Sequence, residues 1–114
     1  MAQPAPTLVT VDGFLAADDL TGTRCQLLRG VVVLEAPSPV VHGALVIRLG
    51  AELRCRLPRF CTAVGEAGIR PPHRNDTFYL ADLAVTCRPL EHGATFLREP
   101  VLVIEVLSPS TEKE

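Results

Sequence analysis

Apolar residues recur every four positions between Val41 and Leu57. Valine or leucine stands at positions 41, 45, 49, 53 and 57, Val46 widens this stripe, and the charged residues of the segment mostly lie off it. This spacing places the apolar side chains on one side of an α-helix, and Pro58 cannot continue the helix. We therefore expect an amphipathic helix of about four turns. Its leucine stripe should pack on a sheet, with its arginines turned outward.

Two short apolar runs, RCQLL and VVVLEA, precede this helix and are separated only by Arg29 and Gly30. A two-residue connection that ends in glycine favours a tight β-hairpin. The second strand should end at Pro37-Ser38-Pro39, because proline cannot donate a hydrogen bond to a neighbouring strand.

The N-terminal residues 1–9 are expected to be a disordered, proline-containing segment. Thr10 can cap a short helix over VDGFLAADD, which Gly22 would end. In that helix Val11, Phe14 and Leu15 share one side, as core-facing residues do.

After Pro58 the pattern changes to short β-like runs: FCTAV, a piece near GIR, TFYLADLAVTC and, after the loop RPLEHGATFLRE, the run PVLVIEVL. The last run is typical of a strand that is buried on both faces. A helix, a hairpin, a long helix and then strands indicate an α+β or mixed α/β fold in one domain, residues 10–114.

Composition excludes some functional classes. The net charge of −2 gives no overall basic field, although six arginines lie in the middle third of the chain, either as a phosphate-facing surface or as the solvated flank of the helix. No apolar run is long enough to span a membrane, and the first residues do not resemble a signal peptide. A cytoplasmic protein is expected.

The four cysteines contain no C-x-x-C pair, which disfavours a structural zinc site. Cys25, Cys55, Cys61 and Cys87 each stand in an apolar context and are interpreted as small buried hydrophobic residues. Disulfides are not expected in a reducing compartment.

Two carboxylates, Asp82 in DLAVT and Glu105 in VLVIEVL, stand within the most apolar β-like runs. An ionised carboxylate inside such a strand costs several kcal/mol unless something compensates it. A divalent cation, a buried arginine or an exposed strand end could each provide the compensation.

The sequence around these carboxylates resembles the Uma-two family of restriction-endonuclease-like proteins, in the PD-(D/E)XK nuclease superfamily. EPVLVIEVLSPST is the specific match, with ADLAV some twenty residues earlier. TVDGFLA and RCQLLRGVVVLEAPSPVVH are looser matches in the right order, and the similarity extends from Thr10 to Thr111. It implies a mixed sheet flanked by helices, and a nuclease acting on DNA.

The resemblance also implies a set of site residues. Asp82 corresponds to the aspartate of the PD element and Glu105 to the acidic residue of the (D/E)XK element. With the backbone carbonyl of Val106 they would hold Mg²⁺ or Mn²⁺, a role that suits oxygen ligands. Gln26 stands where the family has a glutamate that supports the site. His42 matches a histidine after the Pro/Ser loop. It either contacts phosphate or assists the metal, or it is a surface or capping residue in the first turn of the helix.

Other positions depart from the family's pattern. Ala81 replaces the proline of the PD pair, and Leu107 stands where the simple E-x-K spacing has lysine. In the Uma-two pattern the lysine lies instead on the helix that follows SPST. Only Lys113 remains as a candidate for that lysine, and the helix and strand expected after it are absent. The chain is thus interpreted as a nuclease domain incomplete at its C-terminus, prone to self-association through exposed apolar surface. A catalytically inactive binding module and a truncated fragment are the alternatives.

Overall fold

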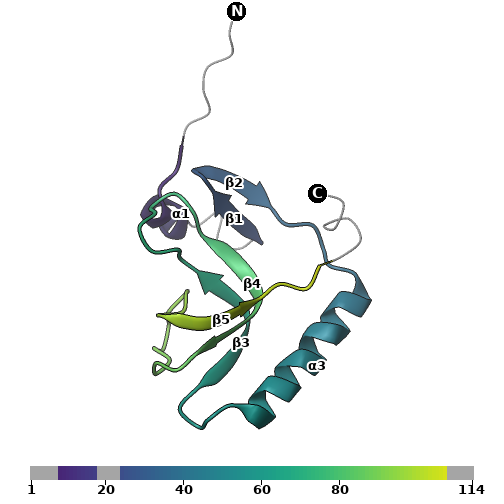
Figure 1. Cartoon of the computed structure of the whole chain (residues 1–114). Helices are drawn as coiled ribbons and strands as arrows, with labels where there is room; N and C mark the ends of the chain where they lie inside the picture. Colours follow the sequence, from purple (N-terminus) through teal and green to yellow (C-terminus); the bar gives the residue numbers. More distant parts are fainter. Residues whose placement is uncertain (1–7, 18–23, 108–114) are drawn as a thin grey trace, which may run out of the picture. The chain divides into compact units, whose positions relative to one another are not determined.

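The computed structural model describes residues 8–17 and 24–107, which form two helices and five strands (Figure 1). The fold is α+β, as the order of the patterns predicted. Two compact units are present: one combines residues 1–36 with 70–79, and the other combines residues 37–69 with 80–114. Residues 1–7 of the N-terminal segment, the predicted helix end at Gly22, and Lys113 lie outside the described residues.

The first unit begins with the predicted capped helix. Helix α1 spans Val11–Ala16, and the Thr10 hydroxyl oxygen accepts a hydrogen bond from the Gly13 N–H at 3.2 Å. Val11 and Phe14 are buried, while Leu15 is half-buried. The sequence therefore located both the cap and the inward side of this helix.

The hairpin that follows also forms as predicted. Strand β1, Cys25–Leu28, pairs antiparallel with β2, Val31–Leu34, and Leu28 lies opposite Val31. Arg29 and Gly30 both have positive φ, 50° and 85°. Positive φ at both central residues defines a type I′ turn, which matches the twist of the flanking strands and explains the glycine.

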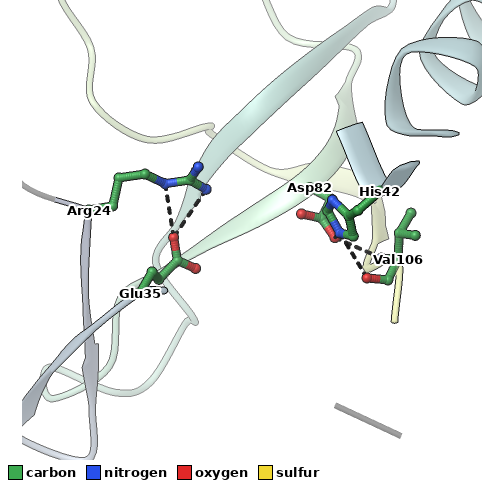
Figure 2. A network of polar contacts seen from close by, with 5 residues as sticks. All are labelled: Arg24, Glu35, His42, Asp82 and Val106. Atoms are coloured by element: carbon green, nitrogen blue, oxygen red, sulfur yellow. Dashed lines mark hydrogen bonds and ion pairs between the residues drawn. The ribbon is translucent and has the colours of Figure 1, made fainter. Parts of the chain in front are cut away.

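An ion pair closes the open end of this hairpin (Figure 2). Arg24 precedes β1 and Glu35 follows β2, and the Glu35 carboxylate accepts hydrogen bonds from Arg24 Nε at 3.2 Å and Nη2 at 3.1 Å. The Glu35 N–H also donates to the Arg24 carbonyl at 2.8 Å. Side-chain and backbone bonds together hold the strand ends at a fixed register.

Residues 70–79 complete the first unit by pairing with the hairpin and α1. Leu27 and Phe78 exchange backbone hydrogen bonds of 2.7 and 2.8 Å, the Gly30 N–H donates to Asp76, and the Val11 N–H donates to Asn75. The Phe78 ring lies 5.8 Å from that of Phe14, centroid to centroid, in a tilted arrangement. Leu27, which is fully buried, therefore belongs to the core of this unit.

We predict that Leu27→Ala lowers the free energy of unfolding by about 2–5 kcal/mol, because a fully buried leucine leaves a cavity. Its neighbour provides the matched control: the Leu28 side chain is 41% exposed, so Leu28→Ala should cost less than about 1 kcal/mol. Urea denaturation of both variants measures the difference. Equal losses of unfolding free energy in the two variants would show that Leu27 does not belong to the core of this unit.

The second unit contains the long helix α3, Val40–Arg56, close to the predicted bounds. The predicted stripe is only partly covered by the described residues. Leu49 and Leu53 are half-buried, whereas Val41 is 79% and Leu45 43% exposed, and no residue of α3 is fully buried. The prediction that the whole stripe packs on the sheet was therefore wrong for its N-terminal half.

The sheet of the second unit has the strand order β3–β4–β5 (Figure 1). Its strands are β3, Thr62–Ile69, β4, Tyr79–Thr86, and β5, Pro100–Ile104. The two separate pieces predicted around FCTAV and GIR are one strand. The positive φ of Glu66, 47°, lies inside it, and Gly65 and Glu66 interrupt the apolar pattern that the prediction followed.

The prediction that β5 is buried on both faces was wrong. This strand is at the edge of the described sheet, and Val101, Leu102 and Val103 are 65%, 43% and 37% exposed. It ends at Ile104, so Glu105 follows the strand instead of lying inside it. The central strand β4 has the expected burial: Ala81, Leu83, Ala84 and Val85 are all buried.

The interpretation of all four cysteines as buried, unbonded residues was also wrong. Cys61, just before β3, forms a disulfide with Cys87, just after β4, and Cys55 is exposed on α3. Among the described residues, Cys25 is the one buried cysteine that is not in a disulfide. The sequence argument failed because β3 and β4 are neighbours, which brings together two residues that are 26 positions apart.

We predict that the double variant Cys61→Ser/Cys87→Ser loses about 3–4 kcal/mol of unfolding free energy relative to the oxidised protein. This figure is the loop-closure term for a cross-link that spans 26 residues. Guanidinium denaturation with and without reductant measures it, and Cys55→Ser is the control that should change nothing. Coincident curves for the wild type with and without reductant would contradict the prediction.

Candidate functional site

Asp82 lies in the middle of the buried strand β4, between Ala81 and Leu83, which are 1% and 4% exposed. Its own side chain is 19% exposed. The Val106 N–H, two residues beyond the end of β5, donates to Asp82 Oδ2 at 2.7 Å. The short hydrogen bond from a backbone amide stabilises the ionised carboxylate within its apolar strand.

His42, in the first turn of α3, meets the same group (Figure 2). Its Nε2 lies 3.2 Å from Asp82 Oδ2 and 2.9 Å from the Val106 carbonyl oxygen, and its side chain is 13% exposed. Both of these oxygens can only accept hydrogen bonds, so Nε2 is the ring nitrogen that carries a proton in this arrangement. One N–H is therefore shared between a carboxylate and a carbonyl.

Two contacts fix α3 against β4, and they lie eight residues apart on the helix. One is the contact between His42 and Asp82. At the other, Gly50 faces Leu83: a Cβ at Gly50 would lie 3.5 Å from Leu83 Cδ2, which is an ordinary van der Waals distance. Eight residues correspond to about 12 Å along the helix axis, which orients α3 and aims the first-turn imidazole at Asp82.

Glu105 and Gln26 are not among the residues in this contact. Glu105 is exposed directly after β5. The β4–β5 ladder pairs Leu83 with Ile104, so one further step in the antiparallel register would set Asp82 opposite Glu105. Gln26 is a half-buried residue of β1, in the first unit. The sharing of one ion by Asp82 and Glu105 stays a prediction.

Few basic side chains compensate the negative charge of the Asp82 carboxylate. Across residues 8–17 and 24–107, His42 is the one basic side chain in an ion pair with it. Several arginines of the middle third are paired with other carboxylates: Arg56 with Glu52, Arg70 with Asp12 and Arg74 with Asp76. The hydrogen bond from the Arg74 guanidinium lowers the pKa of the Asp76 carboxyl. These pairs favour the interpretation of the arginines as a solvated flank.

The chemical types of the donor atoms around Asp82 suit a small cation, although only two of these atoms belong to side chains. A carboxylate oxygen, a carbonyl oxygen and an imidazole nitrogen are all common metal ligands. Within the part of the chain that the structure describes, no three His, Cys, Asp or Glu side chains gather closely enough to hold a metal ion. The set implied by the resemblance needs only two carboxylates and a backbone carbonyl.

The site is separate from the larger hollows of the second unit. A groove of about 600 Å³ between α3 and the sheet is lined by Ile47, Gly50, Leu57 and Leu83 among others, and a smaller one lies under the loop that precedes β5. Neither includes His42, Asp82 or Val106. The contact between His42, Asp82 and Val106 therefore lies outside both hollows.

Comparison with known proteins decides the family. The sequence profile of Uma2, described as "Putative restriction endonuclease", matches residues 11–114. The chain belongs to the Uma2 family. This confirms the resemblance that EVLSPST and ADLAV suggested, and Uma2 membership supports a nuclease-like function. No curated protein and no solved structure matches the chain. Among the described helices, none is both long and apolar enough to cross a membrane.

The sequence did not show which atoms His42 contacts. It indicated a residue that contacts phosphate or assists the metal, and the structure places its Nε2 against Asp82 and Val106, the residues expected to hold the metal. The available signal was its position in the first turn of the helix. Because the contact spans 40 and 64 residues, no local pattern could show it.

We predict that the neutral His42 ring is protonated at Nε2, because both of its partners are hydrogen-bond acceptors. Long-range ¹H–¹⁵N correlation spectra of the metal-free protein distinguish the two tautomers. In Asp82→Ala the signal should shift towards the tautomer mixture of free histidine, while in Asp76→Ala, on the surface of the first unit, it should not change. A dominant Nδ1–H form in the wild type would contradict the observed contact.

Proposed function

We propose that this Uma2 protein is a divalent-metal-dependent endonuclease that hydrolyses phosphodiester bonds in DNA. The observation that carries the proposal is that the Asp82 carboxylate on β4 and the Val106 carbonyl just beyond β5 both lie against His42 Nε2, while the Val106 N–H also donates to Asp82. The family pattern assigns metal binding to these two positions and to Glu105. Mg²⁺ or Mn²⁺ held there would polarise the phosphoryl group and make a nearby water easier to deprotonate.

Each residue of the site would have a separate role. Asp82, fixed by the Val106 N–H, presents a carboxylate whose orientation does not depend on the ligand. Glu105 is exposed directly after β5, and its carboxylate would share the ion with that of Asp82. Gln26 would support the site by hydrogen bonding without adding charge, and His42 would contact the phosphate or the cation.

A catalytically inactive DNA-binding module is the second candidate, and two residues favour it. Gln26 replaces a glutamate of the family pattern, and Leu107 stands two positions after Glu105, where the E-x-K spacing has lysine. A lysine ammonium would stabilise charge that develops on the phosphate. Without it, the two carboxylates could still hold a cation and a DNA backbone while cleaving slowly or not at all.

We predict weak, metal-dependent nicking of plasmid DNA that is lost in Asp82→Ala and in Glu105→Ala. The controls are Asp76→Ala and Glu91→Ala, which remove surface carboxylates paired with Arg74 and Arg98 and should leave nicking unchanged. The assay is run with Mg²⁺, with Mn²⁺ and with EDTA.

The outcomes separate the two candidates. Nicking that persists in both site variants would assign cleavage to other residues and contradict the proposal. The protein would instead be a binding module if it binds DNA only with the metal and with Asp82 in place, and cleaves it with neither Mg²⁺ nor Mn²⁺.

A further inference from the structure

The position of His42 Nε2 defines a third donor to the proposed cation site. Asp82 Oδ2 and the Val106 carbonyl oxygen both lie within 3.2 Å of this nitrogen. Two ligands that are neighbours on an octahedron with bonds of about 2.1 Å are separated by about 3.0 Å. The separations seen here, 3.2 and 2.9 Å, bracket that value. Each of the two oxygens thus lies at about the distance from Nε2 that separates adjacent ligands of one small cation.

The hydrogen bonding without a cation is incomplete, which gives a second reason. One Nε2–H serves two acceptors, so it can be well aligned with only one of them at a time. His42 is also the only basic side chain that pairs with Asp82 among the described residues. A cation would satisfy the nitrogen and both oxygens at once.

We propose that His42 is a direct metal ligand through Nε2, and that its nitrogen makes the site prefer Mn²⁺ and Co²⁺ to Mg²⁺. Imidazole suits transition metals, whereas Mg²⁺ is bound almost entirely through oxygen. The Nδ1 atom then carries the ring proton. This inference rests on the proposed metal site at Asp82 and Val106, and adds to it a ligand and a metal preference.

The arrangement of the helix makes this role feasible. His42 is held in the first turn of α3, and Gly50 of the same helix lies near Leu83 about two turns further on. The ring is 13% exposed and Asp82 is 19% exposed, so both are constrained while water or an ion still reaches them. A preorganised ligand loses little side-chain entropy when the metal binds.

The test is pulsed electron paramagnetic resonance of Mn²⁺ bound to the full chain. Nitrogen directly bound to Mn²⁺ gives a ¹⁴N modulation, which should change to the ¹⁵N pattern when the three histidines are labelled with ¹⁵N. The modulation should persist in His92→Ala and His73→Ala, which remove exposed histidines, and disappear in His42→Ala. The labelling experiment uses the wild type, so it does not depend on how a variant folds.

Binding measurements complete the test. Titrations that follow the signal of free Mn²⁺ should show at least about a tenfold loss of Mn²⁺ affinity in His42→Ala, and competition should show a smaller loss for Mg²⁺. His42→Gln, which keeps a polar side chain but no imidazole, should lose the preference for Mn²⁺ and Co²⁺ as well.

Two results would overturn the inference in different ways. If Mn²⁺ binds and requires Asp82 but shows no histidine modulation, His42 is not a ligand, while the proposed metal site stands. If wild-type protein binds no Mn²⁺, or if Asp82→Ala binds it equally well, the proposed site itself fails and this inference fails with it.

Discussion

The carboxylate of Asp82, placed in an apolar strand, constrains the second unit more than any other group. A charge at that position has to be hydrogen-bonded, because an uncompensated one costs several kcal/mol. Its partners come from both neighbouring segments: the Val106 N–H beyond β5 and the His42 imidazole at the start of α3. Satisfying one side chain thereby fixes the path of the chain after β5 and the direction in which α3 begins.

Elements that local chemistry determines could be predicted from the sequence. The turn at Arg29-Gly30, the cap at Thr10 and the termination of α3 before Pro58 each depend on residues within a few positions of one another. Features that depend on which strands are neighbours could not be. The bond between Cys61 and Cys87 and the exposure of β5 follow from the order β3–β4–β5, which no periodicity encodes.

The candidate site divides in the same way. The sequence indicated that Asp82 and Glu105 are functional candidates, because carboxylates are unusual within apolar runs. The match to Uma2 along residues 11–114 supplies the family. The burial argument held for Asp82, in the central strand, and failed for Glu105, which follows an edge strand. His42 needed the three-dimensional contact, since its role comes from the oxygens around Nε2 and not from its neighbours in sequence.

The disulfide has a consequence for the other unit. Cys61 and Cys87 close a covalent ring of chain, and residues 70–79, which belong to the first unit, form the part of that ring furthest from the bond. The segment that pairs with Leu27 and Gly30 is therefore tethered at both ends by a bond in the second unit. Oxidation restricts the conformations that residues 70–79 can adopt when the first unit unfolds, so this segment loses less conformational entropy when it pairs with the hairpin again.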